Sequence, residues 1–178
     1  MGIRFFVGHG ASGSAASMAP HVEGLRRRGI DAEAIDLPLK KAGAAVIALR
    51  AIVPDGPAAD GTPIAVGGQS YGGRVASLAA AESDTDYAAL VLFSYPLHPP
   101  GSPDRAADRT SHWPAIRCPV LLLSGEADPF ARIELLRAAV PLLRHAELVT
   151  YPRLGHTLRP VLEDALDRTA RFLAGLAS

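Results

Sequence analysis

A serine held between glycines is the first feature of the sequence that could do chemistry. The segment Gly68-Gln69-Ser70-Tyr71-Gly72 follows an apolar run over residues 63–67 and precedes an amphipathic stretch over residues 71–82. In a G-x-S-x-G turn between a strand and a helix, the serine projects from a sharp bend, and the glycines leave room where strand and helix approach. The pattern predicts that Ser70 is a nucleophile; an incidental serine in a glycine-rich turn is the alternative.

A serine hydroxyl attacks a carbonyl only when a base removes its proton, and an acid must orient that base. Two later segments supply these groups, each after a predicted strand: Asp128 follows residues 119–124, and His156 follows residues 147–151. We therefore predict a catalytic triad of Ser70, His156 and Asp128. Glu126 is the rival acid, and a purely structural role at a strand–helix turn is the alternative for His156.

The other histidines and the single cysteine fit this chemistry less well. His21 and His145 fall in or beside predicted helices, which is typical of surface histidines or of histidines with satisfied hydrogen bonds. His98 and His112 lie in a proline-rich segment and could line a pocket, but neither follows the last predicted strand. Cys118 is expected to be a small buried residue, and alone it forms neither an internal disulfide nor a cysteine-built zinc site.

A second glycine-rich turn, Gly8-His9-Gly10-Ala11-Ser12-Gly13, matches the dinucleotide-binding pattern G-x-G-x-x-G, and Asp36 stands where a ribose-binding acid is expected. The turn has another use if Ser70 is a nucleophile, because acyl transfer needs two backbone N–H groups for its oxyanion. We predict that Ala11 and Tyr71 form this oxyanion hole, with Ser12 as the second choice in the loop and His9 bracing it.

The elements that must position these groups alternate regularly. Six short apolar runs cover residues 3–7, 32–37, 63–67, 88–94, 119–124 and 147–151, and helix candidates cover residues 14–28, 41–53, 71–82, 131–140 and 160–176. This alternation predicts a doubly wound α/β fold with a mainly parallel six-stranded sheet and right-handed crossovers. In the strand order second-first-third-fourth-fifth-sixth, the first and third strands are neighbours, which brings Ala11 and Tyr71 toward Ser70.

One connection, residues 95–117, is long and carries five prolines. A loop of this length is more than a simple link, and we expect a short insert over the site rather than a large lid. The predicted substrate pocket consists of Gln69, Tyr95, Leu97, His98 and Phe130. A short cover encloses few methylenes, so short acyl groups are the expected substrates.

Composition sets the broad class. The chain has 178 residues, 48% hydrophobic and 20% charged, which predicts one globular domain over residues 1–178 and argues against disorder. Eighteen basic residues balance eighteen acidic ones, so no strong field attracts nucleic acid or an acidic membrane. No apolar run is long enough for a membrane span, and no secretory apolar segment precedes Gly8, so a cytoplasmic location is expected.

Together these segments resemble the small serine alpha/beta hydrolases of the dienelactone-hydrolase-like group, over nearly the whole chain. The similar segments are residues 8–11, 67–77, 95–101, 109–113, 125–130 and 155–156. The resemblance, including the chain order serine, aspartate, histidine, implies the triad and the oxyanion hole named above. Dienelactone hydrolases proper carry cysteine where Ser70 stands, so their substrate does not carry over. We also expect the chain to lack the two opening antiparallel strands and the large helical lid of bigger hydrolases.

The leading hypothesis is a serine hydrolase, of carboxylesterase or thioesterase type, that cleaves a small ester or thioester through an acyl-enzyme. It implies a small-molecule acyl substrate and no metal or organic cofactor, and it leaves the oligomeric state open. A catalytically idle hydrolase fold kept as a binding or scaffold module is the alternative. A nucleotide-binding oxidoreductase using the glycine turn at residues 8–13 is a third hypothesis, and it leaves Ser70, Asp128 and His156 unexplained.

Overall fold

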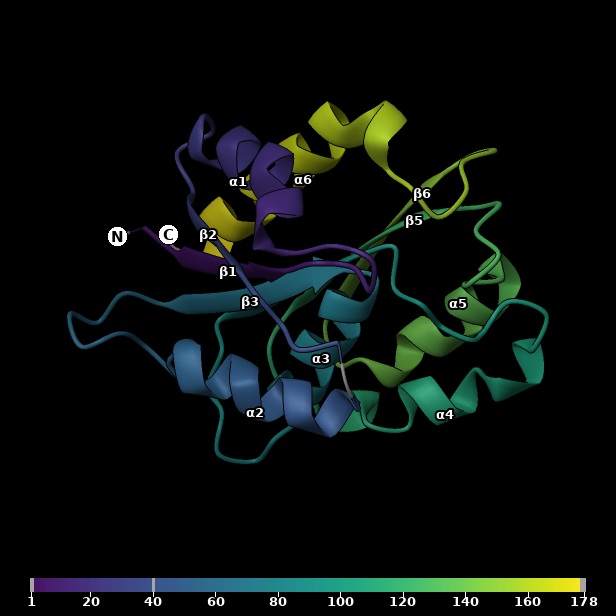
Figure 1. The fold of residues 1–178 in the computed structure, drawn as a ribbon, viewed down its shortest axis with the longest axis horizontal. Coiled ribbons are helices and arrows are strands. Elements are labelled where there is room, and N and C mark those ends of the chain that lie inside the picture. Colours follow the sequence, from purple (N-terminus) through teal and green to yellow (C-terminus); the bar gives the residue numbers. More distant parts are fainter. Residues whose placement is uncertain (1, 40, 177–178) are drawn as a thin grey trace.

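The computed structural model describes residues 2–39 and 41–176, so residues 1, 40, 177 and 178 of the predicted domain lie outside the described part (Figure 1). It contains β1 (Arg4–Gly8), β2 (Asp31–Ile35), β3 (Ile64–Gln69), β4 (Ala89–Phe93), β5 (Val120–Gly125) and β6 (Ala146–Tyr151). All neighbouring strands pair in parallel, in the order β2-β1-β3-β4-β5-β6. The predicted fold class and strand order are confirmed.

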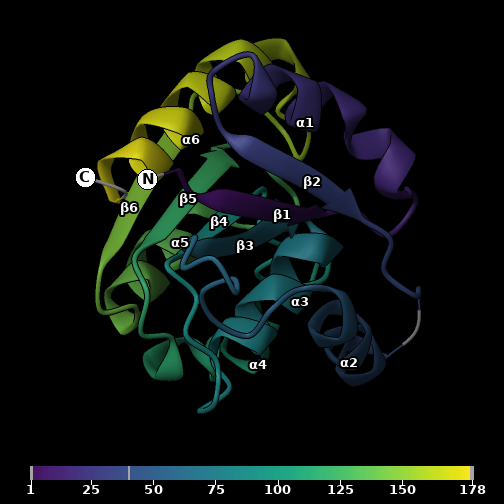
Figure 2. The same ribbon diagram turned by 90° about the vertical axis from the view of Figure 1, so that its left-hand side faces the viewer.

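Helices cover both faces of this sheet. They are α1 (Ala19–Arg26), α2 (Ala42–Ile52), α3 (Tyr71–Ala80), α4 (Ala107–Thr110), α5 (Ile133–Ala139) and α6 (Leu162–Leu176). Helices α1 and α6 lie on one face, and α2, α3, α4 and α5 lie on the other (Figures 1 and 2). None of the helices in the described part of the chain is long and apolar enough to cross a membrane.

The central strand β4 separates two hydrophobic cores. Ala89, Val91 and Phe93 pack toward α1 and α6, whereas Leu90 and Leu92 pack toward α2, α3 and α5, because side chains alternate along a strand. All five are at most 1% exposed. A strand buried on both faces reads as a continuous apolar run, which is why no alternation is visible in its sequence.

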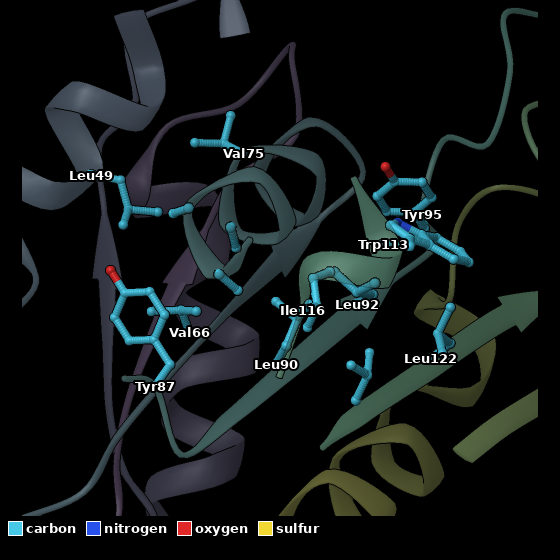
Figure 3. Packing of buried hydrophobic residues seen from close by; sticks show 14 of the residues in the cluster. Leu49, Val66, Val75, Tyr87, Leu90, Leu92, Tyr95, Trp113, Ile116 and Leu122 are labelled. Atoms are coloured by element: carbon cyan, nitrogen blue, oxygen red, sulfur yellow. The ribbon is translucent and has the colours of Figure 1, made fainter. Parts of the chain in front are cut away.

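The proline-rich segment after β4 differs from the expected cover. It forms short helical turns whose large side chains join the core on the α3 side, where Trp113 and Ile116 pack near Leu90 and Leu92 (Figure 3). Tyr95 and Trp113 meet edge to face with ring centroids 5.2 Å apart. Because a buried aromatic ring removes on the order of 150–250 Å² from water, these residues stabilise the fold more inside the core than over a site.

Two hydrogen bonds fasten the same segment. The Tyr95 hydroxyl donates to the carbonyl oxygen of Arg109 at 2.6 Å, and His112 Nε2 lies 2.9 Å from Ser77 Oγ of α3. The Ser77 hydroxyl itself donates to the carbonyl oxygen of Arg74 at 2.8 Å. The first bond therefore closes the segment on itself, and the contact between His112 and Ser77 ties it to α3.

Candidate active site

Ser70 occupies a strained turn between β3 and α3. Its backbone has φ 50° and ψ −112°, a conformation that costs a non-glycine residue on the order of 1–3 kcal/mol. The Ser70 N–H donates to the carbonyl oxygen of Phe93 at 2.8 Å, which fixes the turn against β4. Strain held in this way projects the hydroxyl away from the sheet, as the glycine pattern predicts.

The flanking glycines are needed because backbone lies against them. A Cβ atom on Gly68 would stand 2.6 Å from Gly73 N and 2.8 Å from Gly8 O. One on Gly72 would stand 2.5 Å from Gly8 O and 2.8 Å from His9 O. The collision between strand and helix that the sequence predicts is present, and the turn after β1 adds a second collision.

Ser70, His156 and Asp128 form a continuous chain of hydrogen bonds. His156 Nε2 lies 2.9 Å from Ser70 Oγ, and His156 Nδ1 lies 2.7 Å from Asp128 Oδ2. The Asp128 side chain is fully buried, and its other oxygen accepts the Phe130 N–H at 2.8 Å. Because a carboxylate only accepts, Nδ1 carries the hydrogen in neutral His156 and Nε2 accepts from the serine hydroxyl. This arrangement can take a proton from Ser70.

Two loops bring the acid and the histidine together. Gly125 ends β5 so close to the loop after β6 that a Cβ atom there would collide with the carbonyl oxygens of Leu154 and Gly155. The Ala127 N–H also donates to Leu154 O at 2.9 Å. The docking of these loops places Asp128 beside His156 although 28 positions separate them in the sequence.

The rival acid Glu126 faces a different set of partners. Its Oε1 accepts hydrogen bonds from Thr150 Oγ1 and from Arg137 Nη2, both at 2.8 Å. Neither of these described hydrogen bonds involves His156, whose Nδ1 is bonded to Asp128. The geometry therefore joins His156 to Asp128 and leaves Glu126 in an ion pair beside β6.

The turn after β1 approaches Ser70 closely. Gly8 pairs with Gly68 in the register of β1 and β3, and a Cβ atom on Gly10 would stand 4.0 Å from Ser70 Cβ. The Gly13 N–H donates to Gly10 O at 2.9 Å and closes a tight turn over Ala11 and Ser12. Ala11 thus lies one residue from the contact with Ser70, and Tyr71 follows the serine directly.

His9 and Asp36 fix this turn and the residues after it through hydrogen bonds. The buried His9 ring donates from Nδ1 to Gly10 O at 2.8 Å and accepts the Leu37 N–H at Nε2, 3.0 Å away. Asp36 accepts the Ala15 N–H at 2.7 Å. A single 3-10 turn, Ala15–Met18, separates the glycines from α1, so no α-helix begins at the glycine turn as a dinucleotide site requires.

A cavity of about 400 Å³ opens beside the serine, within the range of small-molecule sites. It lies between the turn after β1, the start of α1, the ends of β3 and β4, and the residues after His156. Its lining residues are Gly10, Ser12, Gly13, Ser17, Pro20, His21, Gln69, Phe93, Ser94, Thr157, Leu158, Arg159 and Leu162. No residue of the segment 95–117 is among them.

The predicted pocket wall does not coincide with the lining of this cavity. Of its five residues only Gln69 lines this cavity, while Phe130 packs on the His156 ring at 4.4 Å between centroids. Tyr95 and Leu97 are core residues, and His98 is buried with Nε2 accepting the Arg132 N–H at 3.0 Å. The chain turns at Ser94, whose φ is 51°, and this bend carries the following residues into the core.

Sequence reasoning also missed His21. The ring is 9% exposed, lies edge-on to Phe93 at 5.2 Å between centroids, and leaves Nδ1 without a hydrogen-bond partner among the described residues. Burial lowers the pKa of His21 to about 4. The expectation of a surface or satisfied histidine is wrong. The signal that could have found it is the helical spacing of apolar residues, because Met18, just before α1, stands three residues before His21, and Leu25 stands four after it.

The family of the protein follows from a comparison with known sequences. Residues 38–173 match the sequence profile of a family described as an alpha/beta hydrolase domain. The chain belongs to this family. The match includes the serine turn, Asp128 and His156, whereas β1, α1, β2 and the glycine turn at residues 8–13 precede it. No functionally curated protein sequence matches the hydrolase.

Solved structures share the fold of this hydrolase. A monoacylglycerol lipase of Paleococcus ferrophilus superposes with a TM-score of 0.81 and 15% identity, covering 99% of this chain and 97% of that chain. Est1E of Butyrivibrio proteoclasticus, bound to ferulic acid, superposes with a TM-score of 0.79 and 19% identity, covering 99% of this chain and 90% of that chain. A dienelactone hydrolase of Anabaena variabilis superposes with a TM-score of 0.71 and 23% identity, covering 96% of this chain and 85% of that chain. These similarities confirm the small alpha/beta hydrolase fold and support a hydrolase activity.

Proposed function

We propose that this hydrolase cleaves a small ester or thioester through an acyl-enzyme formed on Ser70. The observation that carries the proposal is the hydrogen-bond chain from Ser70 through His156 to the buried Asp128, at 2.9 and 2.7 Å. A serine on a strained turn, bonded to a histidine that a carboxylate orients, is the arrangement that nucleophilic acyl transfer needs. The adjoining cavity gives an acyl substrate a place to bind.

Each half of the reaction uses the same groups. Ser70 Oγ attacks the carbonyl carbon while His156 Nε2 takes the hydroxyl proton, and Asp128 stabilises the imidazolium. The carbonyl oxygen becomes an oxyanion, for which Ala11 N–H and Tyr71 N–H are the proposed donors. When the bond to the leaving oxygen or sulfur breaks, His156 returns the proton to it. Water then repeats the sequence on the acyl-enzyme and releases the acid.

Labelling with a fluorophosphonate probe tests the nucleophile. The folded protein is expected to be labelled at Ser70, and Ser70→Ala to lose labelling and ester hydrolysis while keeping its circular dichroism spectrum. Ser77→Ala is the matched control, because Ser77 also lies 2.9 Å from a histidine nitrogen but is fully buried. Absence of labelling in the folded wild-type protein, or esterase activity above a few per cent in Ser70→Ala, would refute the proposal and favour a binding module.

A pair of acid variants tests the orienting group. Asp128→Asn is expected to lower kcat by a factor on the order of 10⁴, because the amide donates toward Nδ1 and holds the wrong tautomer of His156. Glu126→Gln should cost far less, since Glu126 contacts Thr150 and Arg137 instead. The reverse ranking in steady-state ester hydrolysis would assign the orienting role to Glu126.

A further inference from the structure

The cavity beside Ser70 contains two buried polar side chains that the fold leaves without a partner. His21 contributes an imidazole that is 9% exposed, and Ser94 contributes a hydroxyl that is 0% exposed. No described residue hydrogen-bonds to His21 Nδ1 or to Ser94 Oγ. Both residues touch Phe93, His21 through its ring at 5.2 Å and Ser94 as the next residue in the chain, so they belong to one part of the wall.

The rest of the buried polar set behaves differently. The buried polar or charged residues described are His9, His21, Ser77, Thr85, Ser94, His98, Thr110, Ser124, Asp128 and Thr169. Among these ten, only His21 and Ser94 have a buried polar atom without a partner. Three other described atoms, Arg4 Nε, Arg74 Nε and Trp113 Nε1, also lack one, but only His21 and Ser94 line the cavity. Since buried polar groups in native proteins are nearly always hydrogen-bonded, such a pair in a cavity wall indicates groups that a ligand satisfies.

From this coincidence we infer that His21 and Ser94 recognise an uncharged hydroxyl group of the substrate, close to the ester or thioester bond. The inference rests on the proposed hydrolysis at Ser70 and names the substrate class of that same site. A hydroxyl both donates and accepts, and it therefore matches a neutral imidazole with one donor and one acceptor nitrogen, and a serine hydroxyl that can do either.

The electrostatics of the wall favour an uncharged group. Burial holds the pKa of His21 near 4, so its imidazole is neutral at neutral pH. Within the described lining no acidic side chain is present, and its one charged side chain, Arg159, is exposed. A carboxylate placed against His21 would meet no buried cation, and burying an unpaired charge is costly.

The hydroxyl can belong to either side of the ester bond, and a panel of esters separates the two. Propyl butyrate is the reference, propyl β-hydroxybutyrate carries the hydroxyl on the acyl side, and glycerol monobutyrate carries it on the alcohol side. Hydrolysis is followed by pH-stat so that all three are measured alike. One hydroxyl ester is expected to have a kcat/KM about tenfold above that of propyl butyrate, as for one well-placed hydrogen bond.

Two variants tie the preference to the residues. His21→Phe keeps a ring against Phe93 and removes both nitrogens. It is expected to bring the kcat/KM of the preferred hydroxyl ester, divided by that of propyl butyrate, close to one. Ser94→Ala removes a single oxygen and should lower the same ratio. His145→Phe is the matched control, because His145 is exposed and lies outside the cavity lining, and it should keep the wild-type ratio.

The outcomes separate this inference from the proposed function. Failure of fluorophosphonate labelling would refute hydrolysis at Ser70. Normal labelling and turnover of propyl butyrate, with no preference for either hydroxyl ester, would overturn the hydroxyl site alone. A ratio unchanged in both His21→Phe and Ser94→Ala, or a stronger preference for monopropyl succinate, would overturn it as well. If His21→Phe does not fold, the wild-type panel and Ser94→Ala decide.

Discussion

Replacing Gly72 by alanine tests whether the turn after β1 is pressed against the start of α3. Gly72 is the second residue of α3, and its φ is not positive, so helix propensity alone would favour Gly72→Ala by about 0.5–1 kcal/mol. The structure leaves no room for the methyl group. It would stand 2.5 Å from Gly8 O and 2.8 Å from His9 O, whereas ordinary contact begins at 3.4 Å.

The size of the effect follows from these distances. Taking 2.5 Å from 3.4 Å, the turn after β1 and α3 must separate by roughly 1 Å. Overpacking of this kind costs about 1–3 kcal/mol, and here the upper end applies, because the opposing atoms are backbone carbonyls that cannot rotate away. We expect Gly72→Ala to lower the free energy of unfolding by about 3 kcal/mol. A displacement of this size also separates Ala11 from Ser70, which should lower kcat/KM about 10²-fold.

Urea denaturation followed by circular dichroism measures the free energy of unfolding. Ester hydrolysis measures kcat/KM, which reports the effect of the displacement on the site. Gly43→Ala is the matched control, because Gly43 is the second residue of α2 and a Cβ there meets nothing within 4 Å. The free energy of unfolding of that control should rise by about 0.5–1 kcal/mol. Equal stability of the two variants would show that the turn does not constrain α3, and that the elbow does not need glycine at position 72.

The remaining predictions concern acyl length, pH and Cys118. In a p-nitrophenyl ester series from acetate to palmitate, each enclosed methylene contributes about 0.8 kcal/mol of binding free energy. Because the cavity holds about 400 Å³, kcat/KM should stop rising before the octanoate ester. A steady rise beyond octanoate would contradict this. Burial lowers the pKa of His21 and of His112 from 6.5 to about 4, so the unfolded chain binds more protons between these values. The free energy of unfolding should therefore be constant above pH 6.5 and fall as the pH is lowered toward 4, with a smaller slope in His112→Gln; urea curves that do not depend on pH in this window would refute it. Burial raises the pKa of Cys118 to about 11, so iodoacetamide should not modify it at pH 8 in the folded protein.

The sequence was sufficient for those features that depend on strand ends. Ser70, Asp128 and His156 each follow a strand of a parallel sheet, so their approach could be predicted once the strands and their order were assigned. The choice of Asp128 over Glu126 was favoured, but not decided, by the sequence. It depends on how the loop at Gly125 docks against Leu154, which no local pattern reports.

The cavity could not be predicted in the same way. Its wall depends on the left-handed turn at Ser94, and serine is a residue type that gives no signal for a positive φ. It also depends on the packing of Tyr95 against Trp113 in the core. The proline-rich segment was expected over the site because its length and place in the chain permit that, but burial of its aromatic side chains was a stronger effect. For His21 the helical stripe reports burial, whereas the missing partner of Nδ1 is a property of the folded chain only.

The bond between Ser77 and His112 bears on how serine hydrolases are searched for in structures. It has the same 2.9 Å length as the bond between Ser70 and His156, so a search by distance alone would return both pairs from the described part of this chain. The direction of each bond separates them. The Ser77 proton is committed to the carbonyl oxygen of Arg74, so His112 must be the donor and offers no lone pair with which to deprotonate the serine. A search that follows the hydrogens would discard this pair and keep the one at the elbow.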